Sequence, residues 1–490
     1  MGIEDKYQEA LARLGQGDLM GALELLEEIR GTGFENDTLL NAIGNILKRL
    51  KRFDAAAETL NACIQKYGKT KESLSNLAGL YLARKQTREA IEIYGKLLET
   101  SPEDSSLLFD IGTCYLEARE SLQAAEHFKK ALELDNEDPR LWANLGSAYK
   151  LRGKLKEALD CFEEASSRAA ENHVYRWNIG ICQLMLGDEV SGWRHFDSRH
   201  HLSGMSAGLR NIPLWNGRQP LSNRRVVVFS EQGIGDFVQF ARYISPLVNV
   251  AASVTLACPK LLTPLATMTC GGVALLHSKS DCVDAEIQIG IMSLAAVFPN
   301  YSPPMGGYLK IRPAQKLKWK KWLDLQELGP MRVGVAWQGN ADYREDYLRS
   351  IAPEYIIKLA RNVELTFVSL HRNPQPGLTE NGGSFAELLI VDTLDAVGGA
   401  FNDCAGLISN LDLVISSDTS VAHVAAAQGK PVWLLLPRVP DWRWRMHGTD
   451  THWYPSMRLY RQDEDGGWLG LFERLETDLK RLIEESPSRD

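Results

Sequence analysis

The first part of the chain repeats one pattern of small and large apolar residues. Small residues recur every 34 positions, at Ala10, Gly44, Ala78, Gly112, Gly146 and Gly180, and a second small series runs in step at Ala22, Ala56, Ala90, Ala124, Ala158 and Gly192. Larger apolar residues stand four positions after the second series, at Leu26, Leu60, Tyr94, Phe128, Phe162 and Phe196. A small residue lets two helices approach closely, while the larger one fills the adjoining space. The period therefore predicts six helical hairpins between residues 3 and 199.

The pattern changes after residue 223. Nearly continuous apolar runs predict strands at residues 225–230, 254–257, 273–277, 285–289, 331–337, 365–370, 389–391, 411–416 and 431–436. Helices are predicted at residues 237–247 and 419–428. Apolar runs without alternation are typical of parallel strands that are covered on both faces. We therefore predict an α + α/β protein with a helical solenoid at 1–201, a linker at 202–223, and two α/β halves, 224–315 and 316–490, facing one another across a cleft.

The turn SSDTS joins the strand at 411–416 to the helix at 419–428. It thus lies at the carboxyl end of a strand and the amino end of a helix. Open α/β sheets place their ligands there, and the free N–H groups of the helix attract anions. Asp418 in this turn is either a ligand-binding residue or only the N-cap of the helix.

A second turn, EQGIGD, follows the first predicted strand. Gly233 and Gly235 allow the backbone to turn sharply and to approach a ligand closely. The turn fails as a dinucleotide fingerprint, because a third glycine is missing and no acid follows at the right distance on a second strand. Asp236 therefore needs another explanation, of which capping a helix that begins at Phe237 is the simplest.

Composition and charge exclude several classes of protein. The 490 residues are enough for three domains, and the net charge of −8 argues against a general nucleic-acid or anionic-membrane binder. No apolar run is long enough to span a bilayer, and the start is too charged for a secretory signal. The eight cysteines form no CxxC pair, so we expect reduced thiols in a cytoplasmic protein. A metal site at His195, His200 and His201 would need a carboxylate or Cys partner at a suitable spacing, so we expect packing or solvated histidines rather than metal ligands.

The repeats resemble the tetratricopeptide repeat. The match is clearest at Trp142, Leu145, Gly146, Tyr149, Ala158, Phe162 and Ala165, which stand at that family's spacings. The resemblance implies a concave groove that binds peptides or proteins. Asn76, Asp110, Asn144 and Asn178 recur at one repeat position. They form either a ladder that binds an extended peptide backbone, as similar repeats of O-GlcNAc transferase do, or cross-links between neighbouring repeats.

Three motifs of the α/β region resemble the glycosyltransferase type B (GT-B) fold. They are the strand–GIGD–helix entry, the WQGN turn with Arg349-Ser350 downstream, and the block SSDTSVAHVAAAQGKPVWLLL. Together they are most similar to the heptosyltransferase-like family (glycosyltransferase family 9), in its bacterial version fused behind tetratricopeptide repeats. The resemblance covers residues 225–483. It implies two Rossmann-like halves, with the acceptor on the first and a nucleotide-sugar donor on the second.

The resemblance also implies roles for single residues. Enzymes of this kind generally work without a metal, so no cofactor is expected and cations must neutralise the departing diphosphate. Arg349 is the first candidate and Arg344 the second, although Arg344 is as well explained by a surface ion pair. The main-chain N–H groups of Thr419 and Ser420 complete the diphosphate cradle. The turn residues Gly235, Gly339 and Asn340 also belong to the implied donor site.

Three further side chains have an implied role and a plain alternative. Asp418 binds donor hydroxyls, and Asp236 matches the aspartate thought to act as general base in heptosyltransferases. His423, one turn further along its helix, supports the loop or the phosphates, unless it is a satisfied core histidine. Trp444 and Trp453 lie in a Trp- and Arg-rich segment at 437–455, which rims the cleft. We expect both of them to lock the C-terminal segment against the first half rather than to stack on a ligand.

These observations predict a cytoplasmic, bacterial-type glycosyltransferase that is inverting and metal-independent. It would move a sugar from a nucleotide sugar to the hydroxyl of a protein recruited by the repeats, with flagellin as one acceptor by analogy. Two alternatives remain: transfer to lipopolysaccharide or another glycan, and a non-catalytic repeat scaffold with a degenerate GT-B domain.

Overall fold

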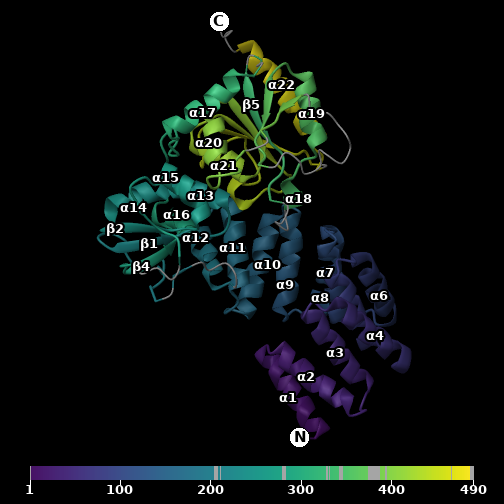
Figure 1. The fold of residues 1–490 in the computed structure, drawn as a ribbon. Coiled ribbons are helices and arrows are strands. Elements are labelled where there is room, and N and C mark those ends of the chain that lie inside the picture. Colours follow the sequence, from purple (N-terminus) through teal and green to yellow (C-terminus); the bar gives the residue numbers. More distant parts are fainter. Residues whose placement is uncertain are drawn as a thin grey trace. The chain divides into compact units, whose positions relative to one another are not determined.

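The computed structural model describes residues 2–202, 208–209, 211–278, 283–326, 329, 331–340, 346–372, 387–391, 394–464 and 466–485. The chain forms two compact units, Met1–Tyr175 and Arg176–Asp490 (Figure 1). The first unit is entirely helical, and the second contains two parallel sheets. The α + α/β class predicted from the sequence is therefore confirmed.

Helical hairpins build the array. Their helices are α1 (Ile3–Gln16), α2 (Leu19–Gly31), α3 (Asp37–Arg49), α4 (Phe53–Tyr67), α5 (Lys71–Ala83), α6 (Thr87–Thr100), α7 (Ser105–Glu117), α8 (Ser121–Leu134), α9 (Pro139–Leu151), α10 (Leu155–Arg168), α11 (His173–Leu186) and α12 (Glu189–Phe196). The two apolar series meet as predicted. A Cβ at Gly44 would lie 2.6 Å from Leu60 Cδ2, and one at Gly112 would lie 2.6 Å from Phe128 Cε1. Each small residue thus leaves room for the larger side chain of its partner helix.

A third series with the same period starts the first helix of successive repeats. Asn36 accepts a hydrogen bond from Leu39 N–H at 2.8 Å, and Asp104 accepts one from Leu107 N–H at 3.1 Å. Thr70 caps α5 in the same way. Each such cap stabilises its helix by about 1 kcal/mol. The caps fix where each repeat begins, and the apolar series fixes how its two helices pack.

The strands that the structure describes in the second unit all run parallel to their neighbours. The first sheet has the order β3-β2-β1-β4 and the second the order β10-β9-β8-β5-β6-β7. The strands are β1 (Arg225–Phe229), β2 (Ser253–Ala257), β3 (Ala274–Leu276), β4 (Ile287–Gly290), β5 (Arg332–Ala336), β6 (Thr366–Ser369), β7 (Leu388–Leu389), β8 (Leu413–Ser417), β9 (Val432–Leu436) and β10 (Met457–Arg461). Nine of these strands were predicted. The edge strand β10 was not, because its sequence MRLYR alternates apolar and charged residues.

Helices surround each sheet (Figure 1). They are α13 (Ile234–Phe240), α14 (Ile244–Val250), α15 (Thr263–Thr269) and α16 (Leu294–Val297) in the first half, and α17 (Pro313–Asp324), α18 (Asp346–Arg349), α19 (Pro353–Asn362), α20 (Asn402–Ile408), α21 (Ser420–Ala427) and α22 (Leu469–Glu485) in the remainder. The single helix predicted at residues 237–247 is wrong. It begins three residues earlier, at Ile234, and a 3-10 turn at Ala241–Tyr243 interrupts it. The early start follows from Gly233, whose N–H is bound by the Asp236 side chain at 2.8 Å.

The last helix of the array belongs to the α/β unit. Trp193 of α12 is 3% exposed and packs edge-on against Phe240 of α13 at 5.7 Å between ring centroids. It packs in the same manner against Trp442 at 5.4 Å and Trp453 at 6.3 Å, which follow β9 in the second half. One side chain of α12 therefore contacts both halves.

The polar joint after α12 is anchored by buried charge. Arg199 is fully buried and donates to both carboxylate oxygens of Glu231, at 2.9 and 2.7 Å. The histidines of this joint pack as expected where contacts are described. His195 shares a hydrogen bond with Gln183 at 2.8 Å, and His200 shares one with Ser293 at 3.2 Å. Burial lowers the pKa of both imidazoles.

Two further features bear on the sequence predictions. No helix in the described ranges combines the length and the apolar character that crossing a membrane requires. The seven cysteines in the described part of the chain are buried and form no disulfides with one another. The eighth, Cys282, lies outside the described residues.

The aromatic contact between α12 and both halves is testable by stability. Trp193→Ala should lower the free energy of unfolding by about 3–5 kcal/mol, because a large buried ring is lost. Val190→Ala on the same helix is the matched control, since Val190 is 73% exposed, and should change it by less than about 0.5 kcal/mol. Urea denaturation of the full chain, followed by circular dichroism, measures both. Equal effects of the two substitutions would contradict the packing described.

Candidate functional site

Two helix N-termini, one from each half of the α/β unit, meet at one point. Gly235 in the first turn of α13 faces the first turn of α21. A Cβ at Gly235 would lie 3.0 Å from His423 Cδ2 and 3.5 Å from Ser420 Oγ. A side chain at this position would fit only if His423 shifted by a few tenths of an ångström. The structure therefore brings together the two turns that the sequence singled out, GIGD and SSDTS.

Asp236 uses both carboxylate oxygens. Oδ2 accepts the Gly233 N–H at 2.8 Å, and Oδ1 accepts a hydrogen bond from Nη2 of Arg443. Its side chain is 15% exposed. Burial raises the pKa of Asp236 above its ordinary value, while Arg443 and the Gly233 N–H oppose that rise. The expectation that Asp236 is the N-cap of a helix beginning at Phe237 is wrong: Asp236 is the third residue of α13, and it accepts the N–H of the N-cap Gly233.

Arg443 joins the two halves. It lies after β9, and its Nε donates to Gln239 Oε1 on α13 at 2.7 Å. Nη1 donates to Asp441 at 2.7 Å, and the guanidinium stacks on the Trp442 ring with 4.2 Å to the centroid. From the sequence, this segment was expected to rim the cleft, and no partner was predicted for Arg443. Its position between two tryptophans was the one feature of the sequence that could have pointed to it.

Asp418 follows the end of β8 and is buried. The N-cap of α21 is Thr419, so Asp418 does not cap this helix. His423 Nε2 lies 3.9 Å from Asp418 Oδ1, which is too far for a hydrogen bond. Burial and the neighbouring Asp441 carboxylate raise the pKa of Asp418 to about 6, although Arg349 and Arg443 oppose this shift. A buried carboxyl of this kind can bind hydroxyl groups in either protonation state.

His423 packs as a core histidine. Its Nδ1 shares a hydrogen bond with the Tyr454 hydroxyl at 2.9 Å, and its ring stacks on Trp444 at 5.7 Å. Burial holds its pKa well below the ordinary value, so the imidazole is neutral near pH 7. A neutral ring adds no positive charge to a phosphate site. The alternative interpretation of His423 as a satisfied core residue is the one its contacts fit.

The WQGN turn places Arg349 near the same point. Gly339 packs under its guanidinium, because a Cβ there would lie 2.7 Å from Arg349 Nη2. Arg349 donates to Asp346 at 2.9 Å, and its charge acts on both Asp418 and His423. Asn340 is exposed on the turn. Arg344, the second predicted cation, lies outside the described residues.

The first turn of α21 keeps N–H groups available. Thr419 makes no side-chain cap, and its hydroxyl instead contacts Ser416 Oγ at 3.1 Å. The first N–H groups of a helix have no partner within the helix. Thr419 and Ser420 therefore present backbone donors beside Gly235.

Four of the buried donor atoms that lack a hydrogen-bond partner within the described part of the chain belong to α13, to the residues at the ends of β5 and β8, and to the turn after β9. They are Gln239 Nε2, Trp337 Nε1, Ser417 Oγ and Trp444 Nε1. The Trp444 indole lies close enough to Asp418 to lower the pKa of that carboxyl, but it makes no hydrogen bond of normal geometry with it. Leaving a buried polar atom unpaired costs about 1–3 kcal/mol, so such atoms are rare in finished structures. Gln239 adjoins Arg443, and Trp444 adjoins His423 and Asp418. Water or the oxygen atoms of a ligand can supply the acceptors that these two donors lack.

The predicted peptide ladder of the array has partners of its own. Asn76 donates to Asn41 at 3.2 Å, and Asn144 donates to Thr113 at 3.4 Å. Burial raises the pKa of Asp110 to about 6. Asn178, the fourth position, is half-buried. Asn76 and Asn144 thus cross-link neighbouring repeats, as the alternative interpretation expected.

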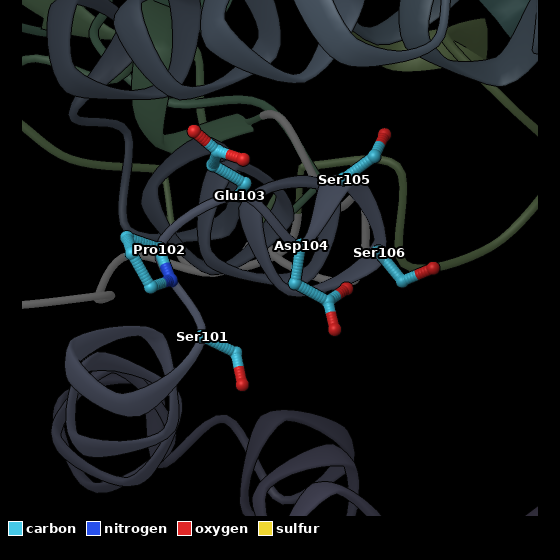
Figure 2. A pocket seen from close by; sticks show the side chains of 6 residues that line it. All are labelled: Ser101, Pro102, Glu103, Asp104, Ser105 and Ser106. Atoms are coloured by element: carbon cyan, nitrogen blue, oxygen red, sulfur yellow. The ribbon is translucent and has the colours of Figure 1, made fainter.

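Two cavities lie away from these residues. One, of about 510 Å³, is lined by residues Ser101–Ser106 at the start of α7 in the array (Figure 2). Asp104 and Ser106 point to one side there and Glu103 to the other (Figure 2), and Asp104 caps the helix. The second, of about 930 Å³, runs beside β10 and α22. The described ranges contain no group of three or more His, Cys, Asp and Glu side chains that could hold a metal ion.

The burial of Asp418 gives a pH-dependent prediction. The pKa of Asp418 is about 6 in the folded protein, which is higher than in an unfolded chain. The protonated carboxyl therefore stabilises the fold fully below about pH 4, and this stabilisation is lost as the pH rises through 6. Ionisation costs about 3 kcal/mol by pH 8. Asp418→Asn should therefore unfold at a higher temperature than the wild type at pH 8, and the difference should shrink toward pH 4.

Differential scanning calorimetry of the full chain measures this effect. Asp284→Asn is the control, because Asp284 is an 85% exposed partner of Arg225, and it should show no comparable change. An Asp418→Asn variant that is destabilised at pH 8 would show that the carboxylate is paired in the folded protein.

Comparisons with known proteins agree with this architecture. Residues 400–435 match the family Glycosyltransferase family 9 (heptosyltransferase), which here spans α20, β8, α21 and most of β9. Residues 7–69, 76–139 and 127–160 match tetratricopeptide repeat families. Protein FlbA of Caulobacter vibrioides is 25% identical over 508 aligned positions, which cover 96% of this chain and 83% of FlbA.

Solved structures of repeat proteins are also similar to part of the chain. A thermophilic TPR protein of Thermus thermophilus is 18% identical, with a TM-score of 0.35, and covers 37% of this chain and 100% of its own. PilF of Pseudomonas aeruginosa is 16% identical, with a TM-score of 0.35, and covers 41% and 91%. From the sequence matches, the chain combines N-terminal tetratricopeptide repeats with a segment of glycosyltransferase family 9, and it is a distant homologue of FlbA.

Proposed function

We propose that the α/β unit transfers a sugar from a nucleoside-diphosphate donor to a hydroxyl group of a protein that the repeats recruit. One observation carries this proposal. The segment that matches glycosyltransferase family 9 contains the N-terminus of α21, and that N-terminus packs directly on Gly235 beside Asp236. The turn expected to bind the sugar donor therefore lies next to the turn expected to act on the acceptor.

The leaving diphosphate needs positive charge. The N-terminus of a helix contributes about 0.3–2 kcal/mol to anion binding, and one charge-assisted hydrogen bond contributes about 1.5–3 kcal/mol. The helix terminus alone is therefore too weak. Arg349 lies next to the same turn and supplies a cation, while the N–H groups of Thr419 and Ser420 supply directed donors. Arg344 is a further cation in this proposal.

The acceptor hydroxyl needs a base. In the proposed reaction its oxygen attacks the anomeric carbon of the donor, the bond from that carbon to the diphosphate breaks, and the hydroxyl proton passes to the Asp236 carboxylate. Direct attack from the opposite face inverts the anomeric centre. Burial favours this role, because it raises the pKa of Asp236 and so makes the carboxylate a better proton acceptor. Asp418 would hold hydroxyl groups of the donor sugar. No metal or cofactor has a step in this scheme.

The repeats support a protein acceptor, because stacked helical hairpins form extended binding surfaces. Flagellin is one candidate. Co-expression followed by intact-mass measurement of the acceptor tests this part. A mass increase that disappears with Asp236→Asn supports transfer to protein, and an unmodified acceptor beside altered lipopolysaccharide contradicts it.

The donor site is tested by nucleotide binding. UDP, GDP, ADP and CDP are screened by thermal shift, and the one that binds is titrated by calorimetry. Arg349→Ala should weaken its binding by about tenfold or more, because a charge-assisted hydrogen bond is lost. Arg361→Ala on α19 is the control, since Arg361 pairs with Glu387 on the surface, and should leave binding unchanged. If none of the four nucleotides binds, the donor site proposed here does not exist.

A further inference from the structure

Both carboxylate oxygens of the proposed base are already engaged. One oxygen of Asp236 holds the Gly233 N–H, and the other holds Arg443. A carboxylate bound by a guanidinium is stabilised in its ionised form and so resists taking a proton. Before Asp236 can accept a proton from a hydroxyl group, its contact with Arg443 must loosen.

Arg443 is well placed to exchange partners. It is buried, and its charge is shared between two carboxylates, those of Asp236 and Asp441. The same charge acts on Asp418 and His423 at the N-terminal end of α21. An anion that binds at this helix end would therefore compete with Asp236 for Arg443.

The surroundings of Arg443 are short of acceptors. Gln239 uses its Oε1 to accept from Arg443 Nε at 2.7 Å, while its Nε2 is buried without a partner. Trp444, the next residue along the chain, leaves its indole N–H without a hydrogen bond. Both side chains belong to residues that are at most 1% exposed. A diphosphate offers several acceptor oxygens and negative charge at once, which is what these donors and the guanidinium lack.

We propose that Arg443 holds Asp236 while the site is empty and binds the donor diphosphate when the site is loaded, so that donor binding frees the base. This rests on the proposed function and adds one cation to its diphosphate site. It also sets an order. The nucleotide sugar must bind before an acceptor hydroxyl can be deprotonated. Before it binds, Asp236 is held by Arg443 and cannot take a proton from a water molecule in the site.

A purely structural role for Arg443 makes a different prediction. If Arg443 only locks the two halves together, removing either partner of the contact damages the site, and both changes weaken nucleotide binding. If Arg443 is shared between Asp236 and the diphosphate, the two changes act in opposite directions. Asp236→Asn releases the guanidinium to the ligand, whereas Arg443→Gln removes it.

The experiment is a calorimetric titration of the full chain with the nucleoside diphosphate, among UDP, GDP, ADP and CDP, that binds the wild type. We expect Asp236→Asn to lower the dissociation constant at least about threefold, and Arg443→Gln to raise it about tenfold or more. The double variant, Asp236→Asn with Arg443→Gln, should not bind the nucleotide more tightly than the wild type. Asp284→Asn, an exposed aspartate that also pairs with an arginine, is the matched control and should bind like the wild type. Circular dichroism confirms that each variant is folded.

The outcomes separate the two proposals. Opposite shifts of the two single variants support the exchange. Asp236→Asn binding no more tightly than the wild type, or Arg443→Gln binding as well as the wild type, overturns it while the donor site stands. Should Asp236→Asn fail to fold, Asp236→Ala, which also removes the carboxylate, takes its place in the comparison with Arg443→Gln. If no nucleotide binds the wild type, the proposed function itself fails, and the exchange fails with it.

Discussion

The α/β unit depends on one constraint: the buried guanidinium of Arg443 needs hydrogen-bond acceptors, and two separate segments of the chain supply them. Arg443 is 9% exposed, and a charge removed from water must be paired or it costs several kcal/mol. Its partners come from α13 in the first half and from Asp441 in its own turn. These hydrogen bonds connect α13 of the first half with the turn after β9 in the second, and hydrogen bonds tolerate little change in length and angle. Gly235 of the same helix lies close to His423.

Other contacts around this guanidinium hold the same arrangement. Arg242 of the first half is also buried and donates to the carbonyl of Trp453 in the second half. Its guanidinium lies over the Tyr454 ring at 4.5 Å, and Tyr454 in turn binds His423. Aromatic rings exclude water here, which strengthens each charged contact. The arrangement is thus both dry and highly charged, a combination that is costly for stability and is typical of sites that bind charged ligands.

Two strained residues flank the site. Gln232 has a φ of 56° and Arg445 a φ of 52°, a region that residues other than glycine rarely adopt. Each is held from outside. Arg199 binds Glu231, the neighbour of Gln232, and Arg461 donates to the carbonyls of Trp444 at 2.6 Å and Arg445 at 3.0 Å. Strain of this kind persists only where the surrounding structure enforces it. The loops that carry Asp236 and Arg443 are therefore held by contacts with the rest of the α/β unit.

Much of the fold could be predicted from the sequence, because repeats and buried strands leave local patterns. The period of 34 predicted the helical hairpins, and the contact of Gly112 with Phe128 shows the packing that the period implied. For the site, the two turns could be predicted but the role of Arg443 could not. The GIGD and SSDTS turns were recognisable from glycines and strand ends, whereas Arg443 meets Gln239 and Asp236 at separations of 204 and 207 positions. No local pattern encodes such a contact. The start of α13 was misplaced for a different, local reason: the cap that Asp236 forms with the Gly233 N–H outweighed the weak helix propensity of Gly235.

The most direct test of this account is a crystal structure of the full chain with a bound nucleoside diphosphate. The account predicts phosphate oxygens within hydrogen-bonding distance of the Ser420 N–H and of the Arg443 guanidinium, with Asp236 Oδ1 released. A nucleotide bound elsewhere, for instance in the cavity beside β10, or an Arg443 that still holds Asp236 beneath a bound diphosphate, would contradict it.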